Sequence, residues 1–385
     1  MCSRFFPQPW TVVPVLLLGI IPIRIEAQTP QWKRVSLTGP RSRDGSAMAY
    51  DIARGRTVLF GGHYYDTAHR YLSDTWEWDG TTWTQVASTG PPARSDLAMA
   101  YDSARHKVVL YGGSFYDTAN RYLNDTWEWD GSVWKQVAVT GPGQRAEHSM
   151  AYHPGRGKVI LFSGTSASAS QLADTWEFNG TAWAQLPPTG PSARLRSAMV
   201  YDSIRGRLVV FGGYHYSTAW TDLDDTWEWA PASGWTAKYP SSSPPARKAH
   251  AMVYDSARGK TVLYGGSAST SLLGDTWEYD GTTWTEVNVT GPYQRHGHAM
   301  AFDSARQTVV LFGPGNDTWE YSVVVAPYTL TDVQQAIRAA GGKIALTAEL
   351  KARLNLVTTG ASATRVDLAD AERIARKVTG LEPNP

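Results

Sequence analysis

Carboxylates, arginine and tryptophan recur together in this chain, and these residue types can do chemistry at the spacing they have. The stretch "DTWEWDGTTWTQV", from Asp74 to Val86, holds three tryptophans and two kinds of carboxylate within thirteen residues. Paired carboxylates with arginines serve glycosidases as acid, base or nucleophile. Tryptophan rings stack on sugars. The alternative is structural, with compensated buried charges and packed rings.

Repetition decides between these interpretations. DTWE occurs six times, at separations of 51, 49, 51, 50 and 42 residues, starting at Asp74, Asp125, Asp174, Asp225, Asp275 and Asp317. Twelve of the 17 tryptophans fall in two repeating columns. One Arg, one Asp and one Glu in every unit favour ion pairs inside or between units. We therefore interpret five residues as structural and predict no catalytic residue among them: Trp32, Trp76, Glu77, Trp83 and Arg94.

Three further segments recur with the same spacing as DTWE, and together with it they define the strands of one repeat unit. An Arg-led strand, "RDGSAMAYD" from Arg43 in the first unit, comes first. An apolar strand ending in glycine follows, as in "TVLFGG", and a tryptophan strand follows each DTWE except the last. Four short strands in a period near 50 residues are typical of a β-propeller. The column of methionines, Met48 for example, indicates packing rather than a metal site.

The sixth unit lacks its tryptophan strand, and a match stands at the other end of the repeats. "QWKRVSLTGPR" from Gln31 matches "TWTQVASTGPP" and "VWKQVAVTGPG". We expect this first strand to complete the last unit, which would close a ring and remove an open sheet edge.

These columns resemble the kelch repeat of galactose-oxidase-like propellers over residues 28–326. The resemblance implies an all-β, six-bladed kelch-type β-propeller with the Arg-led strand innermost and the Trp strand outermost. Galactose oxidase itself uses copper and a cysteine–tyrosine crosslink. The only cysteine here is Cys2, in the expected leader, so that chemistry is excluded.

A binding site on a symmetric ring is expected where the units differ. The loops between the double glycine and DTWE differ, as in "HYYDTAHRYLS" from His63 and "TSASASQLA" in the third unit, and the sixth unit has almost none. Amphipathic aromatics beside polar groups suit carbohydrate or protein ligands. The alternative is that these loops only cover their blades. The candidate ligand-binding residues are His63, Tyr64, Tyr65, Asp66, Arg70, Tyr71, Tyr116, Asp117, Arg121, Tyr122, Tyr216, Trp220, Arg196 and His296.

Other enzymatic interpretations find less support. Sialidase Asp-boxes have the form S-x-D-x-G-x-T-W, whereas Asp79 and Gly80 of "WDGTTW" are adjacent. His296 and His298 lack a clear third ligand, so we predict no metal and no cofactor. A glycan-active hydrolase or lyase remains the alternative to a non-enzymatic binding protein.

The residues before the repeats read as a secretory leader. Arg4 precedes an apolar stretch from Trp10 to Ile23, and Ala27 offers a cleavage point. We expect a signal peptide over residues 1–27, no membrane span in the mature chain, and a secreted or cell-surface protein. The 36 basic and 35 acidic residues are nearly balanced, which argues against nucleic acid as a partner.

The residues after the repeats change to a helical pattern. "VDLADAERIARKVTG" aligns Ala371, Ile374 and Val378 and ends at Gly380. Residues 327–385 resemble a dockerin module, which implies a cohesin-like or surface partner. An EF-hand-type loop ending at Asp370 would have alanines at two ligand positions, Ala361 and Ala363, so calcium is not expected there. A small helical cap beside the propeller is the alternative.

Overall fold

A computed structural model describes residues 30–137, 140–168 and 171–323. The expected signal peptide (1–27) and dockerin-like module (327–385) lie outside these residues. Within the described part, the one helical element is a 3-10 turn, η1 (Pro154–Arg156). No helix there is long and apolar enough to cross a membrane.

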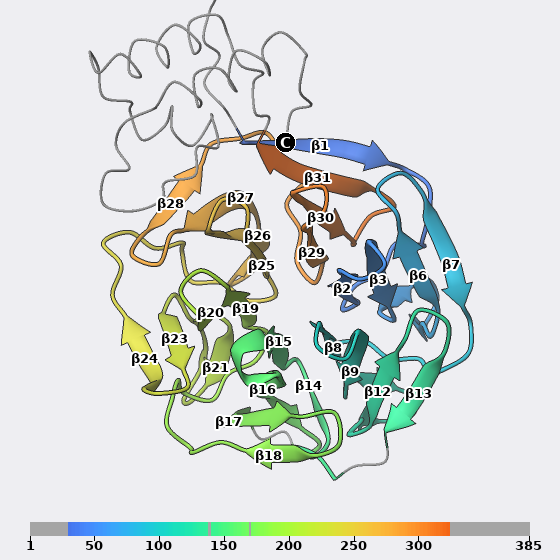
Figure 1. Ribbon diagram of the computed structural model, residues 1–385, viewed down its shortest axis with the longest axis horizontal. Helices are drawn as coiled ribbons and strands as arrows, with labels where there is room; N and C mark the ends of the chain where they lie inside the picture. The colour runs from blue at the N-terminus through green and yellow to red at the C-terminus, as the bar shows by residue number, and fades with distance from the viewer. Residues whose placement is uncertain (1–29, 138–139, 169–170, 324–385) are drawn as a thin grey trace, which may run out of the picture. The chain divides into compact units, whose positions relative to one another are not determined.

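Six antiparallel sheets stand around a central axis, as Figure 1 shows. Each is a blade of four strands, counted from the inside outward. Blade one comprises β2 (Ala47–Asp51), β3 (Arg56–Phe60), β6 (Thr75–Trp78) and β7 (Trp83–Ala87). Blade two comprises β8 (Ala98–Asp102), β9 (Lys107–Tyr111), β12 (Thr126–Trp129) and β13 (Trp134–Val137). Blade three comprises β15 (Ser149–His153), β16 (Lys158–Ser166), β17 (Gln171–Phe178) and β18 (Trp183–Gln185), with β14 (Arg145–Ala146) beside β16.

The other three blades follow the same order. Blade four comprises β19 (Ala198–Asp202), β20 (Arg207–Phe211), β23 (Thr226–Ala230) and β24 (Gly234–Lys238). Blade five comprises β25 (Ala251–Asp255), β26 (Lys260–Ala268), β27 (Ser271–Tyr279) and β28 (Trp284–Val287). Blade six comprises β29 (Ala299–Asp303), β30 (Thr308–Phe312), β31 (Thr318–Val323) and β1 (Pro30–Ser36). The all-β six-bladed architecture predicted from the repeats is therefore present.

The outermost strand of blade six comes from the opposite end of the described chain. β1 pairs antiparallel with β31, and Trp32 stands opposite Tyr321. The indole of Trp32 donates a hydrogen bond to Thr276 of blade five at 2.9 Å. β1 thus occupies in blade six the place that β7 occupies in blade one.

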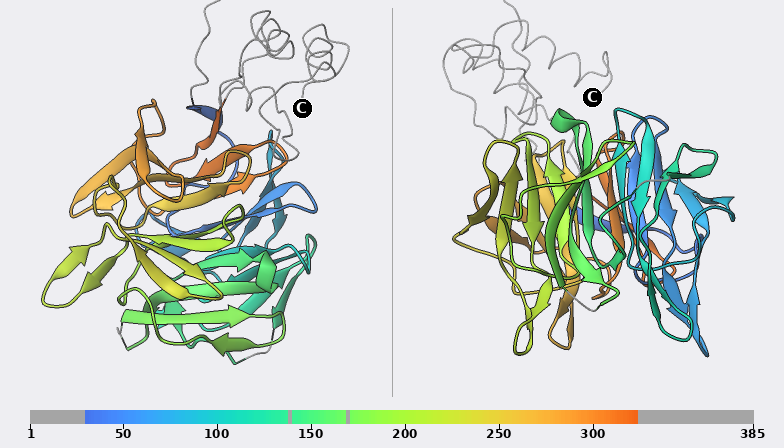
Figure 2. Two further views of the ribbon diagram at one scale, coloured as in Figure 1. Left: turned by 60° about the vertical axis from the view of Figure 1, so that its left-hand side comes forward. Right: turned by 90° about the horizontal axis from the view of Figure 1, so that it is seen from below.

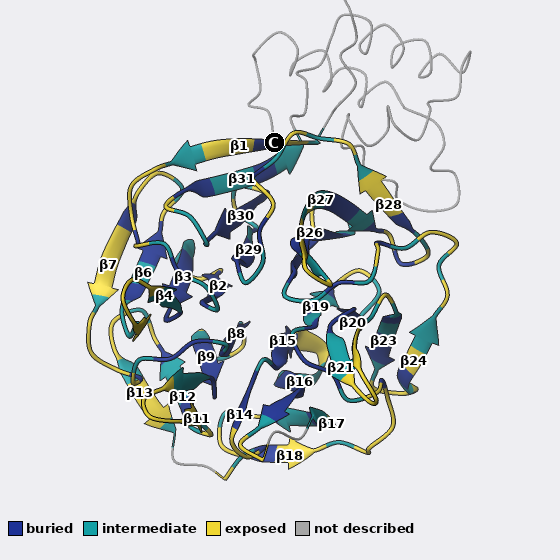
Figure 3. Ribbon diagram, turned by 180° about the vertical axis from the view of Figure 1, so that it is seen from behind, coloured by how far each residue is buried: buried dark blue, intermediate teal, exposed yellow. Residues whose placement is uncertain are grey.

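Burial falls from the inside of each blade to its outside (Figure 3). In β3 the residues Val58, Leu59 and Phe60 are completely buried, because neighbouring blades cover both faces of the second strand. In β7 Trp83 is buried and the next three residues are exposed. A strand that is apolar on both faces is thus the second strand of its blade, and a strand that is apolar on one face is the fourth.

Tryptophan indoles connect every blade to its neighbour. Trp134 of blade two donates to the hydroxyl of Thr75 in blade one at 2.8 Å, and Trp129 donates to Glu77 at 3.1 Å. The Trp-to-Thr hydrogen bond recurs at all six junctions, from Trp32, Trp83, Trp134, Trp183, Trp235 and Trp284. The DTWE threonine is thus an acceptor between blades.

The repeated arginine and aspartate pair within one blade. Arg94 is buried and bonds both carboxylate oxygens of Asp125, at 2.6 and 2.8 Å. It also donates to the carbonyls of Gly112 and Pro92, so its charge is fully partnered. Burial alone would raise the pKa of Asp125, but Arg94 more than offsets this and holds that pKa below its ordinary value.

The double glycine marks the closest approach between consecutive blades. Gly112 has φ +60°, and a Cβ there would lie 2.6 Å from the carbonyl oxygen of Arg145 in the next blade. Blade three has Ser163 at this position, also at positive φ, and its hydroxyl donates to the Arg194 carbonyl at 2.6 Å. A small residue is therefore required where the backbones meet.

The segments between the second and third strands are ordered hairpins rather than irregular loops. Blades one, two and four carry separate two-stranded sheets; blades three and five extend β16–β17 and β26–β27. The separate hairpins are β4 (His63–Tyr65) with β5 (His69–Tyr71), β10 (Ser114–Tyr116) with β11 (Asn120–Tyr122), and β21 (Tyr214–Tyr216) with β22 (Trp220–Asp222). The side views in Figure 2 show hairpins projecting from the propeller. In the described chain blade six has none, since only residues 313–317 join β30 to β31.

Candidate ligand-binding face

Antiparallel strands bring the five hairpins and the segments that enter the inner strands to one side of the propeller, here called the hairpin face. Residue pairs such as Asp44 with His63 and Ser95 with Ser114 join these segments to the hairpins. The candidate residues of the first, second and fourth hairpins all lie on this face, as do Arg196 and His296, which precede β19 and β29.

Neighbouring hairpins contact one another. Tyr71 of the first packs edge-on against Phe115 of the second, with centroids 6.4 Å apart. The side-chain amide of Gln171 in the third bonds both the N–H and the carbonyl of Tyr216 in the fourth. Asp222 of the fourth accepts from the backbone N–H of Ser269 in the fifth at 2.5 Å. These contacts join the first hairpin to the second, and the third, fourth and fifth to one another.

The hairpins expose aromatic groups and pair their own charges. Tyr65, Tyr116, Tyr216 and Trp220 are 69, 50, 51 and 59 % exposed. Arg70 pairs with Asp66 at 3.4 Å, and Arg121 with Asp117 at 3.2 Å, each within one hairpin. Asp66 and Asp117 also accept backbone N–H groups of their own turns. The hairpins thus present exposed aromatic rings together with exposed charged groups that already have a partner within their own hairpin.

A recess of about 510 Å³ lies over blade six, where the hairpin is missing. The first hairpin bounds it with His63, Tyr64 and Tyr65, and the fifth bounds it with Leu272. Its other lining residues are Arg41, Ser42, Arg43, Asp44, Gln294, Arg295, His296 and Pro314. The Arg41 guanidinium lies 3.8 Å from the centroid of the Tyr64 ring. The volume of the recess is typical of pockets that bind a small molecule or one side chain of a partner protein.

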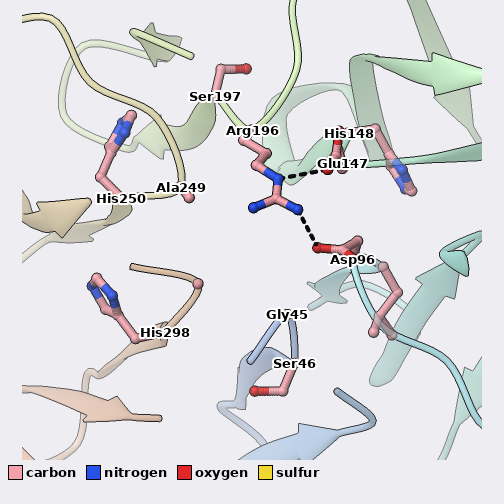
Figure 4. Close-up of a pocket in the computed structure, with 12 residues that line it drawn as sticks. Gly45, Ser46, Asp96, Glu147, His148, Arg196, Ser197, Ala249, His250 and His298 are labelled. Carbon is pink, nitrogen blue, oxygen red and sulfur yellow. Dashed lines mark hydrogen bonds and ion pairs between the residues drawn. The ribbon is translucent and has the colours of Figure 1, made fainter. Parts of the chain in front are cut away.

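A ring of backbone hydrogen bonds surrounds the axis on this face. Six residues, one before each inner strand, have positive φ, and each donates its N–H to the carbonyl of its predecessor in the ring at 2.8–3.0 Å. They are Gly45, Asp96, Glu147, Arg196, Ala249 and Gly297. These residues and those that follow them line a cavity of about 110 Å³, called the channel mouth below (Figure 4).

The channel mouth carries a charged network. Arg196 bonds Glu147 at 2.6 Å and lies 3.6 Å from an oxygen of Asp96, as the dashed lines in Figure 4 show. Burial raises the pKa of Glu147, Arg196 opposes this, and Asp96 adds to the increase. Asp44, beside the mouth, also has a raised pKa, mainly because of burial. Its nearest basic partner is His296, with Nδ1 3.8 Å away.

The structure gathers some candidate residues and separates others. His63, Tyr64, Tyr65 and His296 meet at the recess. Arg196 lies in the channel mouth. The remaining candidates lie along the hairpins, at Asp66, Arg70, Tyr71, Tyr116, Asp117, Arg121, Tyr122, Tyr216 and Trp220.

Sequence reasoning did not select Arg41, Asp44, Asp96 or Glu147. The available signal was the variable column directly before the inner strand, where the units differ most in charge. His298, named with His296 as a possible pair, is buried instead against Tyr264. Among the described residues, no three His, Cys, Asp or Glu side chains converge as metal ligands would.

The fold and the face together define a six-bladed β-propeller whose unit-to-unit differences gather on the hairpin face. The KLHDC2/KLHL20/DRC7 Kelch-repeats domain matches residues 23–190 and 130–313. The chain belongs to this kelch-repeat family.

Known proteins with related sequences match it in part. Adagio-like protein 3 of Oryza sativa subsp. japonica is 27 % identical over 158 residues, which are 38 % of this chain and 24 % of that protein. Kelch domain-containing protein 2 of Bos taurus is 26 % identical over 148 residues, 31 % of this chain and 35 % of its own. The chain thus spans about a quarter to a third of these relatives.

A solved structure supports the fold. "Structure of YjhT" superposes with a TM-score of 0.58 at 12 % identity, covering 74 % of this chain and 96 % of that one. At this identity the likeness concerns architecture alone. Membership of the kelch-repeat family indicates a protein-binding or scaffold role.

Proposed function

We propose that this protein is a secreted, non-enzymatic binding module whose hairpin face engages an extracellular protein. The exposed aromatic groups of the mutually braced hairpins carry this proposal. Tyr65, Tyr116, Tyr216 and Trp220 are at least half exposed. Rigid aromatic anchors with internally paired charges are typical of protein interfaces, where charged groups are depleted at the centre.

The recess over blade six is the proposed anchor pocket for the partner. A side chain entering it would contact Tyr64, Tyr65 and Leu272 and reach the polar groups of Arg41 and Gln294. Hot spots of protein interfaces are side chains in such pockets, surrounded by contacts that exclude water. A carbohydrate is the other ligand this chemistry fits, because tyrosine rings can stack on sugars.

The test compares two sets of exposed apolar residues on opposite sides of the propeller. One variant changes Tyr65, Tyr116 and Tyr216 to serine. The control changes Ile52, Val133 and Ile204 to serine, which lie in the turns at the other ends of the strands and are 58, 59 and 69 % exposed. Each immobilised chain is exposed to extracellular proteins and to a glycan array, and retained ligands are identified.

We expect the tyrosine variant to lose its ligand and the control to keep it. Retention limited to glycans would select the carbohydrate version. Equal retention by both variants refutes the hairpin face as the binding surface.

Secretion, tail docking and ring closure belong to the same proposal. The leader-like residues 1–27 support export, and the dockerin-like pattern of 327–385 supports attachment to a cohesin-like or surface partner. The pairing of β1 with β31 supports closure of the ring by the first strand of the propeller. Deletion of residues 327–385 should abolish surface retention while leaving ligand binding by the propeller intact.

The alternative is a glycan-active hydrolase or lyase. One observation favours it: two carboxyl groups at the hairpin face, Asp44 and Glu147, have raised pKa values, as a general acid requires. Release of reducing sugar from a polysaccharide, abolished by Glu147→Gln, would establish this alternative and overturn the binding role.

A further inference from the structure

The side of the propeller opposite the hairpin face is here called the turn face, because the turns between first and second strands and between third and fourth strands lie on it. Five positions near these turns are charged in most blades. In blade one they are Asp51, Arg54, Arg56, Glu77 and Asp79. Blades one, two and five have three acidic and two basic residues at these positions, and blade six has two acidic residues and one basic residue. Each of these four blades therefore has one excess negative charge there.

Blades three and four, which adjoin in the ring (Figure 1), have lost some of the recurring carboxylates. His153 and Asn179 stand in place of two aspartates in blade three, and Ala230 stands in place of one in blade four. Burial lowers the pKa of His153, so its ring is uncharged at pH 7. At the five positions blade three consequently has one excess positive charge, and blade four has equal numbers of both signs.

The aspartate of the second turn partners a basic residue in other blades. Lys107 lies 3.4 Å from Asp130 in blade two, and Lys260 lies 3.6 Å from Asp280 in blade five. The strands of blade three have the same register as those of blade two, so Lys158 stands beside the turn that lacks this carboxylate. Lys158 has no ion-pair partner among the described residues. Its ammonium group can therefore pair with a carboxylate from outside the propeller.

Blade four has more basic groups than carboxylates to pair with them. Arg207 and Lys238 each lie 3.9 Å from an oxygen of Glu228, and their side chains are 40 and 36 % exposed. Arg205 bonds the same carboxylate directly. Ala230, at the second turn, supplies no further carboxylate. Among the described residues, the partner of Arg207 and Lys238 is thus distant and already occupied.

Arg156 connects the basic groups of the two blades. It bonds Glu177 of its own blade at 2.6 Å but has no aspartate partner, because His153 stands in that place. Its guanidinium lies 5.7 Å from the ring centroid of Trp229, in the third strand of blade four. The residue that pairs with Trp229 directly follows Arg207 in the chain. The excess positive charges of blades three and four thus lie at the same end of adjoining blades.

We propose that the turn face of blades three and four binds an acidic segment of a second protein through Arg156, Lys158, Arg207 and Lys238. Aspartate or glutamate side chains of that segment would supply the carboxylates that the repeat provides in other blades. Arginine forks and lysine ammonium groups both pair with such carboxylates.

The half-buried position of these cations favours a protein segment over an acidic polysaccharide. The Arg156 side chain is 30 % exposed, and Lys158 is also only partly exposed. A carboxylate on a short flexible side chain can reach such groups, whereas the carboxylate of a uronic acid is attached to a rigid ring. The formal charge of the whole chain is only +1, so general attraction for polyanions is not expected. The turn face is separate from the hairpin face, and the inference does not depend on the proposed function.

The experiment titrates the full chain into fluorescently labelled hexaglutamate at pH 7 and follows the fluorescence anisotropy, at low and at high ionic strength. Hexaglutamine is the neutral match, and polygalacturonate is the polysaccharide match. One variant, Asn179→Asp, returns the missing carboxylate. Blade two has Asp130 at this position with the same turn hydrogen bonds, so the fold is kept.

A second variant removes two cations by Lys158→Thr with Arg207→Thr. Threonine fits this column, because blade six carries Thr308 there. The control is Lys107→Thr with Lys260→Thr, which removes the same number of charges from the same column in blades that retain the turn aspartate. Thermal unfolding of every variant confirms that it is folded before binding is compared.

We expect hexaglutamate to bind and hexaglutamine not to bind, with affinity falling as the ionic strength rises. Asn179→Asp should weaken binding about threefold, and the double variant about fivefold or more, as expected for partly exposed ion pairs. The control should bind as the unmodified chain does. No binding of hexaglutamate, equal binding of hexaglutamine, or equal losses in the control and the double variant overturns the proposal. Binding of polygalacturonate without hexaglutamate overturns it in favour of an acidic polysaccharide. The serine variant of Tyr65, Tyr116 and Tyr216 should still bind hexaglutamate, which separates this surface from the hairpin face.

Discussion

Three buried histidines should make the stability of the propeller fall as the pH falls from 7 to 5. His148, His250 and His298 occupy one column of the repeat and are 5–6 % exposed. Burial first, and the Arg145 guanidinium next, lower the pKa of His148 to about 3. The same causes, with Arg295 in place of Arg145, lower the pKa of His298 to about 3, and the pKa of His250 lies well below its ordinary value.

The sign follows from proton linkage. Each folded-state pKa lies below the value of about 6.5 in the unfolded chain, so below pH 6.5 the unfolded state binds more protons and gains stability. At pH 5 the loss is about 2 kcal/mol for each histidine, relative to pH 7. The Asp carboxylates of the Arg–Asp pairs have lowered pKa values, so their protonation reduces the free energy of unfolding only near pH 4 and below. Between pH 7 and 5 the three histidines therefore lower the stability, whereas the raised pKa values of Asp44 and Glu147 act in the opposite direction.

The chain provides its own substitution for the test. Blade two carries the buried Leu97 where blade three carries His148, so His148→Leu keeps an apolar side chain of similar burial and removes the proton site. Urea unfolding followed by tryptophan fluorescence gives the free energy of unfolding at pH 7, 6 and 5. We expect the variant to lose about 2 kcal/mol less than the unmodified chain between pH 7 and 5. Parallel pH profiles for the two proteins would refute the reasoning.

Substitutions at four positions test the contacts between and within blades. Arg94→Met should destabilise by about 3–5 kcal/mol, because it leaves Asp125 without its buried partner; Arg295→Met, whose bonds to Asp317 are longer at 3.1 and 3.3 Å, should cost less in urea unfolding. Trp134→Phe should lower stability by about 1–3 kcal/mol, since the buried Thr75 hydroxyl loses its donor; a thermal-unfolding midpoint unchanged within 1 °C would contradict this. Gly112→Ala should destabilise more than Gly112→Ser in the same assay, because Ser163 shows that a serine at this position can donate to the facing carbonyl; the reverse order would show that only side-chain size matters.

The blades could be predicted because each strand type repeats six times in register. The two-sided apolar pattern of "TVLF" and the one-sided pattern of "WTQV" determine which strand is covered by neighbours. The partner of each buried charge could not be predicted in this way. Arg94 and Asp125 stand 31 residues apart and pair within one blade, whereas Trp129 reaches Glu77 across a junction. The repeat places an arginine, an aspartate and a glutamate in every unit, so the sequence does not show which of them pair inside one blade and which reach across a junction.

The candidate face could be located from the sequence, but the channel mouth could not. The hairpins attract notice because their lengths differ. Sequence reasoning selected Arg196 but not Asp96 or Glu147 at the equivalent positions, because these residues share no residue type. What they share is a left-handed backbone that bonds to its neighbour in the ring, a property that Asp, Glu, Arg, Ala and Gly all provide here. A backbone requirement of this kind leaves the side chain free to vary.

The two irregular features of the hairpin face lie in the same sector of the ring. The recess exists because blade six has no hairpin among the described residues, and the two glycines of the channel mouth, Gly297 and Gly45, belong to blade six and to the adjoining blade one. Asp44 and His296 line the recess, while the residues that follow them, Gly45 and Gly297, line the mouth. A partner side chain held in the recess would therefore lie one residue away from the channel mouth.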